Sequence, residues 1–319
     1  MAVATGLRTA GPWLALALLT AAFAIDDARF AGPANLRTIL DGCAVPLVLA
    51  VGMTFVIRQG SIDLSVEGTM AACSLVFGLA VANDRTSFDF GWLALAVAAA
   101  AGAALGAANG LAVTRLRVPS FVATLGLGSI GLGLAMLLSS DQPPLIHDAQ
   151  LRQWALGQTL GLPSLAIVAV ACLLFGLFVE RHTRCGRYSF AVGGAESVAR
   201  ASGIDVDTSK VVVFAFAGFM TGTAAALESA RLGIGGVDIG AGRMLAAITA
   251  VIIGGAPLGG GSGSVLGSAA GVLMLGVLAN GLVFVGATPY LEKAIEGGIV
   301  LVAAGLASSR ARDRLAVVK

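Results

Sequence analysis

The densest group of ionisable side chains lies at residues 193–210, in the stretch GGAESVARASGIDVDTSK. Glu196 and Arg200 are four residues apart, in the order that favours an ion pair on a helix. Gly203 follows as a natural helix stop, and Asp207 is placed to cap the next helix. These residues predict a short surface helix carrying a salt bridge. Alone, they leave two interpretations open, a solvated connecting loop and a helix that docks on a partner protein.

A second set of polar side chains falls inside apolar stretches, where charge is costly and therefore often functional. The set comprises Asp63, Glu67, Glu228 and Asn280. We expect these side chains to line a path for a polar solute. Each carboxylate can instead lie at a membrane surface, and Glu228 can pair with Arg231, three residues further on. Asn280 is more typical of a hydrogen bond between helices.

Residues typical of catalysis or metal binding are few and scattered. His147 and His182 have no Ser or Cys partner at a catalytic spacing. The four cysteines include no CxxC pair and form no cluster with histidine. We therefore predict no catalytic residue, no metal site and no disulfide framework.

Two glycine-rich stretches have features of phosphate-binding loops. Gly126, Gly128 and Gly131 make a formal GxGxxG, but the motif lies in an apolar helix with no strand before it. The stretch GGAPLGGGSGS at 254–264 is not followed by Gly-Lys-Ser/Thr. We therefore expect no nucleotide site on this chain and a non-helical break at 254–264.

The elements that position these residues follow from an apolar composition. Hydrophobic residues make up 57% of the 319 residues and charged residues 12%, against roughly 25% charged residues in soluble domains. So few charges cannot solvate the surface of a protein this long, and lipid is the expected solvent. The net charge of +2 gives no reason to expect a nucleic acid partner.

A spanning helix needs about 20 apolar residues, and ten stretches meet or approach that length. They lie at 11–25, 42–57, 64–82, 91–114, 119–138, 162–180, 211–230, 244–256, 264–285 and 290–307. The sequence thus predicts an all-α polytopic membrane protein of about ten transmembrane helices, with residues 1–319 as one domain. The stretch 244–256 is short and ends in glycines, which predicts a half-helix. Gly102, Gly106 and Gly110, spaced four apart, predict a close helix–helix contact.

Orientation is predicted from Lys and Arg, which accumulate on the cytoplasmic side. With both termini inside, about two thirds of the 20 Lys and Arg residues fall in cytoplasmic segments. This N-in, C-in topology places the loop 181–210 in the cytoplasm and the loop 139–161 outside. The first stretch also has signal-peptide features, Arg8 and Ala22-Phe23-Ala24, but an uncleaved helix is the expected form in a polytopic protein.

Several longer stretches resemble one protein family. HTRCGRYSFAVGGAESVARASGIDV (182–206) is similar to the cytoplasmic loop of permeases from ribose/xylose/galactose-type ABC importers. Three further stretches resemble the same family: AVGMTFVIRQGSIDLSVEG (50–68), ANGLAVTRLRVPSFVATLG (108–126) and AAITAVIIGGAPLGGGSGSVLGSAAGVLMLGVLANGL (246–282). Together they extend the resemblance over most of the chain. Ser61 and Glu67 depart from it, since glycine is common at both positions.

The resemblance implies a type II ABC importer permease fold and the import of a sugar, such as a pentose. The implied partners are cytoplasmic ABC ATPase subunits, a periplasmic sugar-binding protein, a second permease subunit and membrane lipid. ATP is then used by a partner, so this chain needs no cofactor, and its place is the bacterial inner membrane. The alternative is a self-sufficient ion-coupled secondary transporter, a class that typically carries intramembrane carboxylates in paired broken helices.

The resemblance also favours docking for the polar stretch at 193–210. In the family, the matching helix is the coupling helix, which sits in a cleft of the ATPase. The implied docking residues are Gly194, Glu196, Ser197, Val198, Arg200, Ser202 and Gly203.

Overall fold

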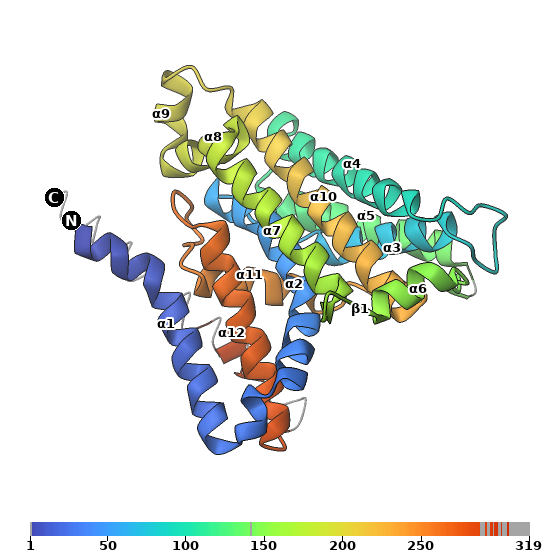
Figure 1. Cartoon of the computed structure of the whole chain (residues 1–319). Coiled ribbons are helices and arrows are strands. Elements are labelled where there is room, and N and C mark those ends of the chain that lie inside the picture. The colour runs from blue at the N-terminus through green and yellow to red at the C-terminus, as the bar shows by residue number, and fades with distance from the viewer. Residues whose placement is uncertain are drawn as a thin grey trace.

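The computed structural model describes residues 2–140 and 142–287, together with the single positions 291, 294, 295, 297, 298, 301 and 305 (Figure 1). Its apolar helices are α1 (Ala2–Asp26), α2 (Pro33–Arg58), α3 (Val66–Ala80), α4 (Leu93–Arg115), α5 (Ser120–Ser139), α7 (Ser164–His182), α10 (Val206–Leu232), α11 (Arg243–Ile253) and α12 (Val265–Phe284). The other elements are η1 (Ala28–Ala31), α6 (Ala149–Leu156), β1 (Gln158–Thr159), β2 (Leu162–Pro163), α8 (Arg184–Gly194) and α9 (Glu196–Ala201). Within the described residues, α2, α4, α5, α7, α10 and α12 are long and apolar enough to cross a membrane.

These helices confirm the prediction of an all-α membrane architecture. The first nine predicted spans each coincide in position with one apolar helix, and the tenth, 290–307, lies almost entirely outside the described residues. The one departure within the described residues is a small hairpin in which β1 pairs with β2 in antiparallel fashion. Leu160 and Gly161 close this hairpin with positive φ angles, as a two-residue hairpin turn requires.

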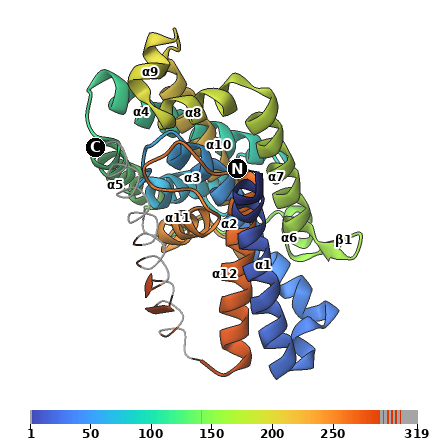
Figure 2. The ribbon, with the colours of Figure 1, turned by 90° about the vertical axis from the view of Figure 1, so that its left-hand side faces the viewer.

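The helices run between two ends of the molecule. At one end, α8 and α9 lie together in both views (Figures 1 and 2). At the other, the end of α1, η1 and the end of α12 gather, and the ring of Phe30 packs against those of Phe23 and Phe284 at centroid distances of 5.2 and 5.4 Å. We call these the α9 end and the η1 end.

Two of the non-helical segments between apolar helices form breaks that contact each other. Residues 59–65 separate α2 from α3, and residues 254–264 separate α11 from α12. The two breaks meet at the α9 end, where Gly261 donates its backbone N–H to the carbonyl of Arg58 at 2.8 Å. As a result α3 has only 15 residues and α11 only 11, which confirms the half-helix predicted for 244–256.

Helices α4 and α10 pack with their backbones in direct contact. A Cβ atom on Gly102 would overlap the carbonyl oxygen of Gly218. A Cβ atom on Gly106 would likewise overlap the carbonyl oxygen of Phe214, and Gly110 lies just as closely against α10. Because only glycine leaves room for this approach, the predicted close contact at the three glycines of α4 is confirmed.

We predict that Gly106→Leu destabilises the protein, because the new side chain has no room against α10. Overpacking of an interior costs about 1–3 kcal/mol. Gly126→Leu on α5 is the matched control, since a Cβ atom there meets only open space. The measurement is the melting temperature of the purified protein in detergent. Equal melting temperatures for the two variants would contradict the tight contact between α4 and α10.

Candidate functional site

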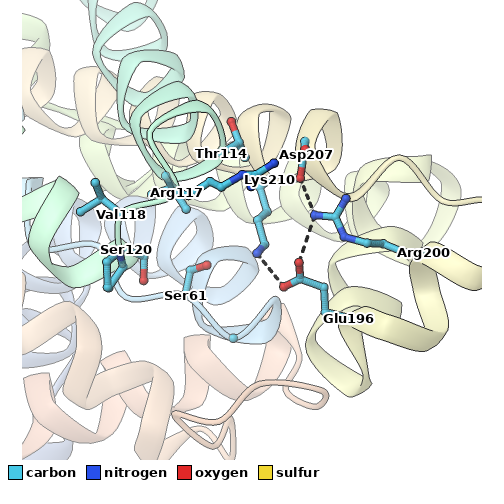
Figure 3. Close-up of a pocket in the computed structure, with 12 residues that line it drawn as sticks. Ser61, Thr114, Arg117, Val118, Ser120, Glu196, Arg200, Asp207 and Lys210 are labelled. Atoms are coloured by element: carbon cyan, nitrogen blue, oxygen red, sulfur yellow. Dashed lines mark hydrogen bonds and ion pairs between the residues drawn. The ribbon is translucent and has the colours of Figure 1, made fainter.

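The polar stretch forms α9, which ion pairs tie to α10 (Figure 3). Glu196 pairs with Arg200 at 3.1 Å and with Lys210 at 2.7 Å. Arg200 also pairs with Asp207, at 2.5 Å. The bond between Glu196 and Arg200 confirms the predicted pairing along the helix. The hydrogen bond from Lys210, and a further one from Arg200, lower the pKa of Glu196, so this carboxylate stays ionised at neutral pH.

The end of α9 is set by Gly203, which has a φ of +80°. Its N–H bonds to the carbonyl of Arg200, and the N–H of Ile204 bonds to the carbonyl of Ala199. This pair of bonds is the Schellman motif, which favours glycine because of the left-handed backbone. The predicted helix stop at Gly203 is therefore confirmed.

The prediction that Asp207 caps α10 is wrong. Asp205 is the cap, and its side chain accepts a hydrogen bond from the backbone N–H of Thr208 at 3.1 Å. A hydrogen bond from the Thr208 hydroxyl, together with this backbone one, lowers the pKa of Asp205. Asp207 lies inside the first turn of α10 and pairs with Arg200 instead.

The outer face of α9 is mostly uncharged. Ala199 is buried against Val192 and Val206, so the opposite face of the helix points away from the protein. Val198 is 62% exposed in the middle of α9. The implied docking residues that are exposed without an ion pair in the described structure are Gly194, Ser197, Val198, Ser202 and Gly203. A partner at this surface would meet small and apolar side chains, while the charges of Glu196 and Arg200 brace the helix against α10.

Arg58, the last residue of α2, is a buried cation that joins four elements. Its Nη1 lies 2.6 Å from the carboxylate of Glu180 on α7. Its Nε and Nη2 donate to the hydroxyl of Ser189 and the carbonyl of Gly186, both on α8. The second oxygen of Glu180 accepts from the N–H of Val265, at the start of α12. No local pattern in the sequence indicates this group, because Arg58 and Glu180 are 122 residues apart.

Asp63 lies in the break between α2 and α3 and is only 3% exposed. One of its oxygens accepts both the N–H and the hydroxyl of Ser65, at 2.8 and 2.6 Å. Hydroxyls of Ser120 and Thr124 on α5 accept two further N–H groups of the break. Asp63 thus has the contacts of a backbone cap, and its predicted place in a solute path stays a prediction.

Glu228 is a buried carboxylate, 4% exposed, near the end of α10. Arg231 lies 2.8 Å from it and Arg243, at the start of α11, lies 2.9 Å from it. Arg231 also lies 3.7 Å from Asp41 on α2. The pairing with Arg231 was expected from the spacing, whereas Arg243 is an addition of the tertiary structure. Two carboxylates and two guanidinium groups together form a neutral cluster between α2, α10 and α11.

The two remaining path candidates also bond within the chain. Glu67 accepts the backbone N–H of Gly242 at 3.1 Å, so it lies beside the Arg243 end of the neutral cluster. Asn280 accepts a hydrogen bond from the side chain of Asn35 at 2.9 Å, the contact between helices that is typical of asparagine. Asn280 also lines a groove of about 350 Å³ between α2, α11 and α12. Glu67 and Glu228 therefore each bond to a residue at the start of α11, while Asp63 and Asn280 bond elsewhere.

Metal-ligating side chains do not gather in the described part of the chain, where no three His, Cys, Asp or Glu residues come within reach of one ion. The four cysteines are free thiols, and Cys43 and Cys73 are buried.

We predict that Glu228→Gln lowers the melting temperature, because two guanidinium groups lose their shared carboxylate. Breaking a fully buried ion pair costs about 3–5 kcal/mol, and the loss here should be smaller since both arginines are about a quarter exposed. Arg243→Gln should have a similar effect, and the double variant should lose less than the sum of the two. A Glu228→Gln protein with unchanged stability but no solute uptake would instead assign Glu228 to the path.

Comparison with known proteins shows similarity over nearly the whole chain. Residues 36–304 match the family model described as "Branched-chain amino acid transport system / permease component". The chain is 35% identical to the ribose import permease protein RbsC of Escherichia coli (strain K12), over 91% of this chain and 90% of that protein. It is 33% identical to RbsC of Bacillus subtilis (strain 168), over 93% and 92%. It is 30% identical to the L-arabinose transport system permease protein AraH of Escherichia coli (strain K12), over 92% and 88%.

No solved structure matches the chain. The family model nevertheless covers the described apolar helices from α2 to α12 except for the first three residues of α2, and α9 with its ion pairs lies within the matched residues. A match of this extent identifies the chain as a member of that family of multi-pass transport-system permease components.

Proposed function

We propose that this chain is the membrane-spanning permease subunit of an ATP-binding-cassette importer that carries a sugar across the bacterial inner membrane. The observation that carries this proposal is the identity to permeases named for ribose and L-arabinose import, over about nine tenths of the chain. Both names refer to pentoses, so a pentose is the proposed substrate class.

The proposed subunit works with three kinds of partner. Cytoplasmic ABC ATPase subunits hydrolyse ATP, so the permease itself is non-catalytic and needs no cofactor. A periplasmic sugar-binding protein delivers the sugar, and a second permease subunit completes the path. The exposed face of α9 around Val198 supports docking to the ATPase, because the ion pairs to Asp207 and Lys210 would pass a displacement of α9 on to α10.

An ion-coupled secondary transporter is the alternative function. Such a transporter needs an intramembrane carboxylate that binds and releases an ion. Glu228 is already paired with Arg231 and Arg243, and Asp63 holds the backbone and hydroxyl of Ser65. The two guanidinium groups leave no unpaired charge on Glu228, and Ser65 occupies one oxygen of Asp63 in the described structure, which favours the ATP-driven function.

Uptake of labelled ribose and arabinose tests this function. The chain is expressed with its ATPase and binding-protein partners in cells that lack other pentose importers. Uptake should require an active ATPase and should persist in a protonophore as long as ATP is maintained. Uptake by this chain without the ATPase, abolished by the protonophore, would support the secondary transporter instead.

A substitution on the outer face of α9 tests the docking surface. We predict that Val198→Asp abolishes uptake and sugar-stimulated ATP hydrolysis in the assembled importer, because it places a charge on an apolar contact. The melting temperature should not change, since Val198 is exposed and the ion pairs of α9 remain. Gln153→Asp is the matched control, because Gln153 is exposed on α6, at the end of α10 away from α9 (Figure 1). Wild-type uptake by Val198→Asp would rule out docking at this face.

Thiol labelling tests the proposed orientation, with α9 in the cytoplasm. In a background where the four native cysteines are replaced by alanine, Gln150→Cys on α6 should react with a membrane-impermeant reagent in intact cells. Ser197→Cys on α9 should react only after the membrane is opened, because the positive-inside rule places its loop in the cytoplasm. Both positions are exposed, so accessibility depends on the side of the membrane. The opposite labelling pattern would invert the topology.

A further inference from the structure

A cavity of about 580 Å³ lies at the α9 end, between the break at 59–65, the turn from α4 to α5, and helices α9 and α10 (Figure 3). Its volume falls in the range of small-molecule sites, about 300–1,000 Å³. The charged residues of its lining are Arg117, Glu196, Arg200, Asp207 and Lys210. Sugar import as proposed above assigns no role to this cavity.

The lining residues carry one more positive charge than negative charges, so their ion pairs do not neutralise the cavity. Glu196 pairs with Lys210 and Arg200, and Arg200 pairs in turn with Asp207. Arg117 forms no hydrogen bond or ion pair with any residue that the structure describes. The three cations and two anions therefore give the cavity a net charge of +1, centred on Arg117.

The backbone of Arg117 is strained. Its φ is +54°, in the left-handed region that is unfavourable for residues other than glycine. Such conformations persist where the surrounding structure holds them, and they cluster at ligand sites. Here the turn between α4 and α5 keeps a charged side chain in the lining of the cavity, without a partner in the described structure.

Two hydroxyl groups of the lining have unused donors. Ser61 is 4% exposed and makes no side-chain hydrogen bond within the described structure. Ser120 accepts the N–H of Ile62 at 3.1 Å, and its own proton has no acceptor among the described residues. Together with the guanidinium of Arg117, these groups offer donors to a ligand that supplies acceptors. An ionised phosphate offers several acceptor oxygens together with a negative charge, which a sugar hydroxyl lacks.

We propose that this cavity binds a phosphate group, held by the guanidinium of Arg117 and the hydroxyls of Ser61 and Ser120. Glu196 and Asp207 are the opposing acceptors in the lining, and Lys210 and Arg200 offset their charges. A guanidinium suits this role, because its fork of N–H groups matches two phosphate oxygens. The inference goes beyond sugar import and does not depend on it.

The phosphate can come from an anionic lipid headgroup or from a free phosphate compound. The turn that carries Arg117 joins two membrane-crossing helices and so lies at a membrane surface. Leu116 and Phe121 on either side of it are 71% and 51% exposed, which suits contact with acyl chains. Basic pockets between transmembrane helices bind lipid headgroups in this way, while the open, polar cavity also admits a soluble phosphate.

Thermal stability and phosphate binding test the proposal with the purified full-length chain in nanodiscs. In one arm the nanodiscs contain only phosphatidylcholine, and inorganic phosphate is titrated against sodium chloride at equal ionic strength. In the other arm, phosphatidylglycerol replaces part of the phosphatidylcholine. The test variant is Arg117→Asn, because asparagine tolerates a left-handed backbone but carries no charge. Arg115→Gln is the matched control, an exposed arginine in the same segment that does not line the cavity.

Wild type and Arg115→Gln should both be stabilised in at least one arm, and Arg117→Asn should bind the effective ligand about tenfold more weakly. A response to phosphatidylglycerol alone would identify the lipid headgroup as the source, and a response to inorganic phosphate alone would identify a soluble compound. An equal response of Arg117→Asn and Arg115→Gln, or no response in either arm, would overturn the proposal.

Discussion

A peptide group that leaves a helix inside a membrane has no water to bond, so it must find a partner within the protein. The same constraint applies to any peptide group buried in a protein, and several groups of both breaks find their partners within this chain. The hydroxyls of Ser120 and Thr124 on α5 accept hydrogen bonds from N–H groups of the first break, and the carboxylate of Asp63 accepts another. The carbonyl of Arg58 accepts a hydrogen bond from the N–H of Gly261 in the second break. Closing one break therefore supports the other, and the half-helices α3 and α11 become possible.

The side chain of Arg58 extends this arrangement to the α9 end. Its bonds to Glu180 on α7 and to α8 position the segment from which α9 follows. A single buried cation thus links the backbone of the two breaks to the proposed docking surface. Loss of either charge would leave the other buried and unpaired, which is costly in a low-dielectric interior.

Helix α10 carries charged groups near both of its own ends. Its first turns hold α9 through Asp207 and Lys210, and its last turns hold the start of α11 through Glu228. Its 27 residues correspond to about 40 Å of helix, and the glycine contact with α4 supports its middle. Under the proposed function, α10 is the element that relates the ATPase-facing surface to the half-helix α11.

Several charged side chains of this structure form ion pairs that hold helices together, as Arg58 does with Glu180 and Glu228 does with Arg243. This is expected where lipid surrounds the protein, since an unpaired charge there is unfavourable. Arg117 is different, because it faces a cavity and has no partner among the described residues. Arg115 is likewise unpaired in the described structure, so it is the place of Arg117 in a cavity lining that makes its side chain available to a ligand.

The sequence by itself determined the positions of nine apolar helices, the half-helix α11, the ion pair between Glu196 and Arg200, and the stop at Gly203. Each of these depends on run length or on residues within one helical turn, which neighbouring positions encode. Only the tertiary structure decided which distant charges meet. In the folded chain Arg58 pairs with Glu180, Glu228 pairs with Arg243, and Asp207 pairs with Arg200 instead of capping α10. An ion pair between elements depends on how those elements pack and not on their spacing along the chain.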